Sequence, residues 1–190
     1  MKREAYGAPY IQYSALWYHT LMDTAVYEKL LQASIRFVSY RPRSEKEIRD
    51  FLETKLKRWK TFGGTVVQKV VDRLAELGYV DDAKFVAWWI EQRQTFKPKG
   101  MLLIIQELKA KGISREFLED VVCQFSSDRN KVDKLLDEAK AARGAVQKKL
   151  LLWQKLPLLV RKKKLFDFLS RRGFSWDTIS RVIDEVAGKE

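Results

Sequence analysis

The chain contains one helical sequence pattern three times, and this repeat limits its possible folds more than any other feature. Residues 108–122 and 169–183 match without a gap, in the order leucine, basic residue, glycine, apolar residue, serine, acid and three apolar positions. A third copy at residues 52–71 fits when a short insertion is allowed near residues 59–64. A period of roughly 50–60 residues predicts small helical units stacked side by side.

The composition favours helices over strands. Glycine and proline are scarce, with nine and four in 190 residues, and no segment alternates apolar and polar residues over any length. Hydrophobic residues make up 46% and charged residues 33% of the chain, which is typical of a folded protein. We therefore predict an all-α fold made of repeated helical units.

Local helix signals mark the start and end of helices in each copy. Ser44 is followed three residues later by Glu47, a capping box in which each side chain accepts a backbone hydrogen bond at a helix start. Ser114 and Ser175 are predicted to cap the helices that follow Gly112 and Gly173. Both glycines are expected to adopt a positive φ at a helix end.

Basic residues on either side of a proline suggest where the repeats begin. The motif at residues 41–43 recurs at residues 97–99. We predict an N-terminal extension with a helix at residues 1–40, a first repeat at 41–95 and a second at 96–155. A third repeat, shortened by about one helix, occupies residues 156–190.

The chain lacks the residues that most catalytic and metal sites require. His19 is the only histidine and Cys123 the only cysteine, so neither a Ser–His site nor a structural zinc site is expected. Cys123 lies on an apolar helix face and is predicted to be buried. We predict no enzymatic activity, no cofactor and no metal. No internal disulfide is possible and no apolar run approaches about 18 residues, so a cytoplasmic protein is expected.

The net charge of +12 favours a negatively charged partner. Residues 126–190 hold most of the excess, with sixteen bases and nine acids, whereas residues 1–33 sum to zero. A polyanion or an acidic protein surface would be attracted to this charge. Solubility alone is the alternative explanation.

Basic clusters stand before the first helix of each predicted repeat and near its end. Stacked repeats would bring them into a line that suits a phosphate backbone, whereas helix-end electrostatics offers a simpler explanation. The basic residues Lys57 and Arg58, in the lengthened helix of the first copy, either extend this line of charges or have no role in binding. The residues predicted to bind nucleic acid or a filament are Arg41, Arg43, Lys57, Arg58, Lys97, Lys99, Lys109, Lys111, Arg161, Lys162, Lys163, Lys164, Arg171 and Arg172.

Four segments in order resemble the RecX family, regulatory proteins of the bacterial recombinase RecA. They are residues 41–49 (RPRSEKEIR), 77–82 (LGYVDD) followed by Phe85, 107–113 (ELKAKGI) and 169–174 (LSRRGF). The resemblance covers about residues 33–187. It implies tandem three-helix repeats in an elongated, curved array. The chain departs from the family pattern at Leu56, where a glycine is usual, and in the proline motif at residues 97–100.

The resemblance also implies a function. A RecX protein would lie along a RecA filament on single-stranded DNA and modulate, in most cases inhibit, strand exchange and ATPase activity in DNA repair and recombination. The expected partners are the RecA filament and single-stranded DNA, with double-stranded DNA left open, and the protein is expected to be a monomer without membrane contact. The alternatives are a sequence-tolerant DNA-binding protein that needs no RecA, and a scaffold that binds only proteins.

Overall fold

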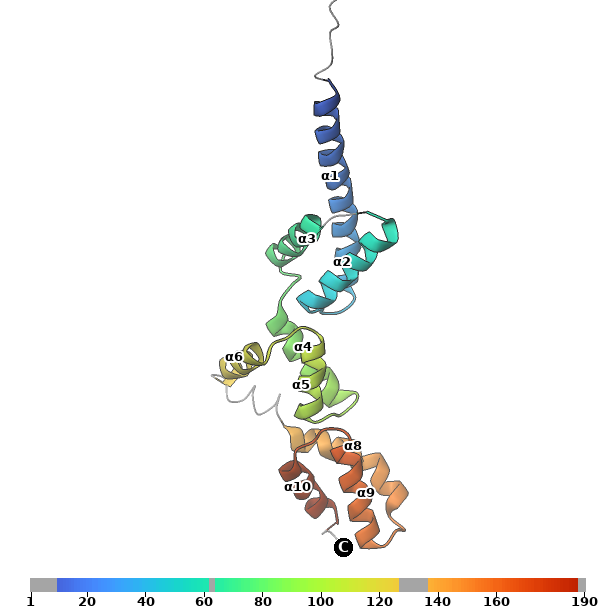
Figure 1. Ribbon diagram of the computed structural model, residues 1–190. Coiled ribbons are helices and arrows are strands. Elements are labelled where there is room, and N and C mark those ends of the chain that lie inside the picture. Colours follow the sequence, from blue (N-terminus) through green and yellow to red (C-terminus); the bar gives the residue numbers. More distant parts are fainter. Residues whose placement is uncertain (1–9, 62–63, 127–136, 188–190) are drawn as a thin grey trace, which may run out of the picture. The chain divides into compact units, whose positions relative to one another are not determined.

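The structure, a computed structural model, describes residues 10–61, 64–126 and 137–187. No strand occurs in these ranges, which confirms the predicted all-α fold. The helices are α1 (Tyr10–Ser39), α2 (Glu45–Trp59), α3 (Gly64–Glu76), α4 (Asp82–Thr95), α5 (Met101–Ala110), α6 (Arg115–Ser126), α8 (Glu138–Trp153), α9 (Leu158–Ser170) and α10 (Trp176–Ala187) (Figure 1).

The first of two compact units ends at Asp81 and has a core made by α1, α2 and α3. Ile48, Leu52 and Leu56 follow one another at four-residue spacing, so they lie on one face of α2, and that face is buried. Leu30 of α1 and Leu74 of α3 complete the centre of this core and are fully buried. Each such side chain stabilises the fold by about 1.5–3 kcal/mol through burial.

The second unit starts at Asp82 and contains two cores. One is formed by α4, α5 and α6, and the other by α8, α9 and α10. The buried pair Ile104 and Leu108 on α5 corresponds to Leu165 and Leu169 on α9, at the same four-residue spacing. Each core therefore belongs to one set of three helices.

The cores group the helices differently from the predicted repeat boundaries. Helix α4 packs with α5 and α6, although residues 41–95 were expected to form one repeat. Helix α8 packs with α9 and α10, so the third repeat has three helices and is not shortened. The first helix lies before the proline motif in the first two repeats and before Pro157 in the third, and because its sequence is not shared among the copies the pattern could not reveal it.

The predicted helix ends agree with the structure. Gly112 and Gly173 have φ values of 89° and 76°. At the start of α2 the Ser44 hydroxyl accepts a hydrogen bond from the Glu47 N–H at 3.2 Å. At the starts of α6 and α10 the Ser114 and Ser175 hydroxyls accept hydrogen bonds from the Phe117 and Thr178 N–H groups. The first repeat ends its middle helix differently, because the left-handed position is taken by a lysine, Lys60, with a φ of 54°.

Two backbone segments meet closely where the second and third repeats join. The Gly100 N–H donates to the Arg172 carbonyl oxygen at 2.8 Å, and a Cβ added to Gly100 would lie 2.0 Å from the Gly173 oxygen. The Glu138 carboxylate accepts hydrogen bonds from the Met101 N–H at 2.9 Å and from the Ser175 hydroxyl at 2.7 Å. One side chain thus joins the start of α5 to the start of α10, which fixes these two repeats to each other.

Candidate cationic binding surface

Each repeat places a cation over an aromatic ring, three residues after the buried leucine of its middle helix. These residues, which we call the terminal cations, are Lys55, Lys111 and Arg172, and they occupy the same position of the repeated sequence pattern. Lys55 lies 5.2 Å from the Phe51 ring centroid, Lys111 lies 5.4 Å from Trp89, and Arg172 lies 4.6 Å from Phe168. A ring face attracts a cation, so each charge is held in place by its own repeat.

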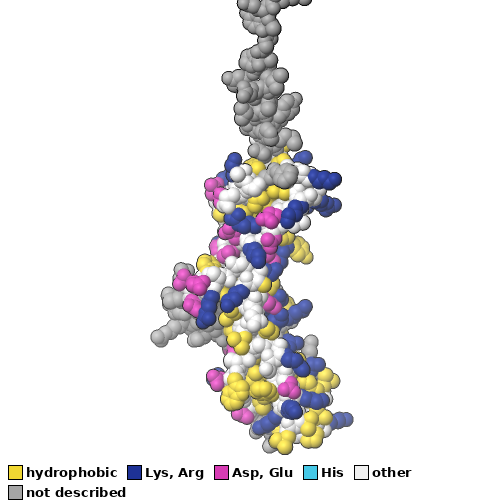
Figure 2. Space-filling model, in the orientation of Figure 1, with side chains coloured by type: hydrophobic (Ala, Val, Ile, Leu, Met, Phe, Trp, Pro, Cys, Tyr) yellow, Lys and Arg dark blue, Asp and Glu magenta, His cyan; other side chains and the backbone are white. Residues whose placement is uncertain are grey.

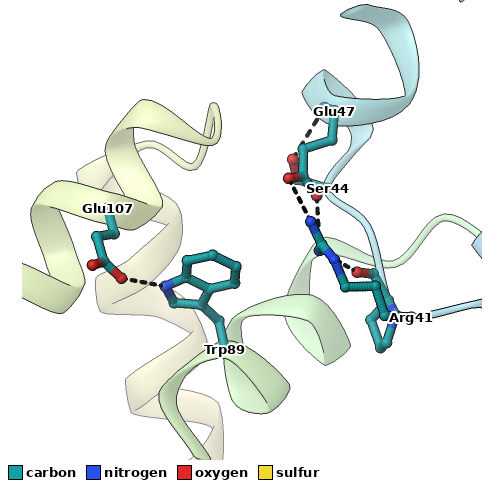
Figure 3. Close-up of polar contacts among 6 residues, drawn as sticks. Arg41, Ser44, Glu47, Trp89 and Glu107 are labelled. Atoms are coloured by element: carbon teal, nitrogen blue, oxygen red, sulfur yellow. Dashed lines mark hydrogen bonds and ion pairs between the residues drawn. The ribbon is translucent and has the colours of Figure 1, made fainter. Parts of the chain in front are cut away.

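The ring under the terminal cation comes from the middle helix in the first and third repeats and from the first helix in the second. In every repeat an aromatic residue of the first helix contacts the residue just before the buried leucine of the middle helix. Phe37 stacks on Phe51 with centroids 4.2 Å apart, and Trp153 meets Phe168 edge to face at 6.1 Å. In the second repeat this position is Glu107, and the Trp89 indole donates a hydrogen bond to its carboxylate at 3.0 Å (Figure 3).

A second cation approaches the first-helix ring in every repeat. Arg43 lies 3.9 Å from the Phe37 centroid, and Arg93 lies 4.3 Å from that of Trp89. Lys149 lies 5.9 Å from both Trp153 and Phe168. Each repeat therefore holds two cations on aromatic side chains, which is a suitable arrangement for binding an anion without first ordering long side chains.

Glu107 lies between two basic side chains of the second repeat. Its carboxylate accepts a hydrogen bond from Arg93 at 2.6 Å and also pairs with Lys99. Burial acts to raise the pKa of Glu107, but the hydrogen bonds and charges of Lys99 and Arg93 together outweigh it and lower that pKa. The carboxylate is ionised at neutral pH, so it offsets one of the cations around it.

The two arginines before α2 differ in their surroundings. Arg41 donates hydrogen bonds to both carboxylate oxygens of Glu47, at 3.0 and 3.1 Å (Figure 3). Arg43 lies over Phe37 instead, and burial, followed by the charge of Arg41, lowers its pKa. Both guanidinium groups are half-buried, so they present only part of their surface to a ligand.

The basic run before the third copy is divided by the helix on which it lies. Arg161 is only 5% exposed, so it cannot belong to an exposed cationic surface, unlike the prediction for this run. Lys162 is 3.8 Å from Asp184, whereas Lys163 and Lys164 are exposed. The helix turns Arg161 toward the core and Lys163 and Lys164 toward solvent, so the four residues do not form one exposed patch.

The remaining predicted residues lie on the surface or at the repeat junction. Arg172 donates a hydrogen bond to the Pro98 carbonyl oxygen at 2.9 Å. This bond links the turn after α9 to the loop before α5, so basic residues from both segments lie at the repeat junction. Lys and Arg side chains are spread among acidic and apolar ones on the face in view rather than gathered in one block (Figure 2). The predicted residues that are exposed are Lys57, Arg58, Lys97, Lys109, Lys163, Lys164 and Arg171.

Comparisons with known proteins identify the repeats. Family profiles described as the second and third three-helix domains of RecX match residues 81–122 and 137–183. A protein of Chlorobaculum tepidum named "Regulatory protein RecX" is 30% identical over 169 residues, which are 89% of this chain and 95% of that protein. The chain belongs to the RecX family. It therefore belongs to a family of regulatory proteins.

Other RecX proteins define how much of the family this chain shares. The RecX of Bacillus subtilis is 30% identical over 159 residues, but the chain spans only 55% of that protein's length. Crystal structures of RecX from Lactobacillus salivarius and of another RecX protein have the same fold, with TM-scores of 0.67 and 0.66 and 21% and 22% identity. They cover 86% and 96% of this chain, and the chain covers 97% and 82% of theirs.

The RecX domain boundaries agree with the cores of the structure. The second-domain profile spans α4 to α6, and the third-domain profile spans α8 to α10. Arg93, Lys149 and Lys55 were not among the residues predicted from the sequence to bind a ligand. Comparing the three copies position by position would have identified Lys55, because it aligns with Lys111 and Arg172.

Three further predictions concern features outside this surface. Among the residues that the structure describes, no group of three or more His, Cys, Asp or Glu side chains is placed to hold a metal ion. Within the same ranges no helix is both long and apolar enough to span a membrane. The predicted burial of Cys123 falls on a side chain outside those that the structure describes.

Proposed function

We propose that this protein regulates the recombinase RecA by binding the RecA filament on single-stranded DNA, and that it limits strand exchange and ATP hydrolysis during repair and recombination. The observation that carries the proposal is the recurrence of the terminal cations Lys55, Lys111 and Arg172, one in each repeat. A filament repeats its protein and phosphate groups along its length. A chain of repeats with a fixed cation in each is suited to such a ligand.

The proposed mechanism is binding, without a chemical step or a cofactor. Cations already held over rings lose little side-chain freedom when they meet phosphates, and each phosphate contact releases counterions. The bound protein would then block access to the DNA or to neighbouring recombinase subunits. We propose that it acts in the cytoplasm as a monomer, and that the exposed basic residues Lys97, Lys109 and Arg171 add to the contact.

Replacing all three terminal cations by glutamine tests the proposal. The variant K55Q/K111Q/R172Q should require on the order of tenfold more protein to inhibit RecA strand exchange. For single-stranded DNA each phosphate contact adds about 0.7 to the salt dependence of log K, so losing three should flatten that slope by about 2. Strand exchange, RecA ATPase activity and binding across a salt series would be measured.

A matched control removes equal charge from elsewhere on the surface. Lys29, Lys69 and Lys140 are exposed, and none of them lies over an aromatic ring in the contacts described above. The variant K29Q/K69Q/K140Q should inhibit nearly as well as the original protein. Equal losses in both variants would reduce the effect to net charge, and no effect of the original protein on RecA would contradict the proposal. Equal binding to bare DNA with and without RecA would favour the RecA-independent alternative.

A further inference from the structure

An apolar surface is exposed where α8 and α9 meet. Leu151 and Leu152 on the last turn of α8 are 69% and 70% exposed, and Leu159 on the first turn of α9 is 81% exposed. Leu158 and Val160 beside it are also largely exposed. We call these five residues the α8–α9 tip. Large aliphatic side chains gathered in this way on a protein surface mark a site of interaction.

The tip lies in the most basic part of the chain. Residues 139–166 contain nine Lys and Arg residues and no Asp or Glu. Lys155, in the turn between the helices, is exposed, as are Lys163 and Lys164 on α9. In Figure 2 the end of the molecule drawn around this turn has apolar side chains with Lys and Arg next to them. A ligand of this surface must therefore combine apolar groups with negative charge.

We infer that the α8–α9 tip docks an acidic protein segment that carries leucine-sized apolar side chains. Burying the exposed leucines supplies the affinity, and the surrounding lysines select acidic partners. A nucleic acid fits less well, because bases stack on aromatic or arginine side chains and Trp153 contacts Phe168 instead. A membrane surface is the competing ligand, because basic residues beside exposed leucines also suit anionic lipid, and the vesicle titration below decides between the two.

This inference goes beyond the proposed function and does not require RecA. The terminal cations serve the phosphate-rich ligand, whereas the five tip residues themselves are uncharged. Leucine substitutions in the tip therefore remove no charge. They separate the two sites, because they should leave binding to single-stranded DNA unchanged.

The test uses a fluorescently labelled helical peptide of glutamate and leucine, with leucines at i and i+3 or i+4 spacing. Binding of this peptide to the full chain would be followed by fluorescence anisotropy. The variant L151Q/L152Q/L159Q should bind it on the order of tenfold more weakly. Glutamine is a good helix former, so these exposed positions should stay folded, which circular dichroism would verify. A matched control is L77Q/L102Q, which changes exposed leucines elsewhere and should bind like the original chain.

Parallel measurements separate the other ligands. The same proteins would be titrated with vesicles rich in anionic lipid and with an oligothymidylate, and their mass would be followed by light scattering. The inference holds if only peptide binding falls in the tip variant. It is overturned if the peptide does not bind, if both leucine variants bind it equally, or if the tip variant instead loses vesicle binding, DNA binding or self-association.

Discussion

Position 107 shows how one residue changes a cluster while the fold around it is kept. Repeats 1 and 3 place Phe51 and Phe168 at this position, where each packs against the aromatic residue of the first helix. Glu107 accepts hydrogen bonds from Trp89 and Arg93 instead. An ion pair replaces a ring–ring contact, so the packing at this position depends on the charge of Glu107.

Glu107→Gln should destabilise the protein by about 1–2 kcal/mol at neutral pH, because Arg93 and Lys99 lose their shared charge partner. The pKa of Glu107 is lowered by folding, so its contribution is present above the ordinary value of 4.5 and is lost as pH falls through the lower folded value. The difference between variant and original protein should therefore shrink below about pH 4.5. Urea unfolding at a series of pH values measures it.

Glu119→Gln is the matched control for that experiment. Glu119 pairs with Arg115 on the surface of α6, where solvent weakens the interaction. The free energy of unfolding of the Glu119→Gln variant should differ from that of the original protein by less than about 1 kcal/mol at any pH. A Glu107 effect of the same size in acid and at neutral pH would show that packing, rather than charge, is responsible.

At the scale of helices, the second and third helices of the repeats have similar sequences, whereas the first helices do not. The buried leucine, the basic residue and the capping serine recur in the sequence because turn geometry and core contacts require those residue types. Helices α1, α4 and α8 share only an aromatic residue that contacts the middle helix, and its place within the helix differs among them. That single position is too weak a signal to find without coordinates, which is why the predicted boundaries fell one helix late.

Gly100→Ala should destabilise the second unit by about 1–3 kcal/mol or more, because the new methyl group would meet the Gly173 backbone oxygen. Gly144 lies inside α8 with nothing within 4 Å of an added Cβ. Gly144→Ala should stabilise the protein by about 0.5–1 kcal/mol through a lower entropy cost. The free energy of unfolding in urea would be measured for both variants. An unchanged value for Gly100→Ala would mean that the backbone segments at Gly100 and Gly173 move apart easily.

The whole chain divides into two compact units, although it has three repeats. The first repeat has its own unit, whereas the second and third share the other and are joined by Glu138 and by the Gly100 contact. Repeat proteins gain stability from each repeat and from the interfaces between neighbours. Unfolding of one repeat should therefore spread most readily between the second and third.

Equivalent core substitutions in the two units should destabilise different numbers of helices. Leu52→Ala and Leu169→Ala each remove a fully buried side chain and should cost about 2–5 kcal/mol. Native-state hydrogen exchange should show loss of protection in α1 to α3 for Leu52→Ala. For Leu169→Ala the loss should extend from α8–α10 into α4–α6. Equal loss throughout the chain in both variants would contradict two separate units.

The sequence by itself determined the helical class, the number of repeats and the turns between the second and third helices. These depend on residues close in the chain, such as Gly112 with Ser114 and Gly173 with Ser175, whose local geometry is independent of distant contacts. It also carried the resemblance that the RecX comparisons confirmed.

Only the tertiary structure decided which helix begins each repeat and which basic residues reach the surface. Arg161 looked equivalent to Lys163 in a basic run, yet a helix turns neighbouring residues in different directions and buries one of them. The rings beneath the terminal cations come partly from a preceding helix, as Trp89 does for Lys111. Contacts between residues far apart in the chain are set by packing, and local sequence patterns do not encode them.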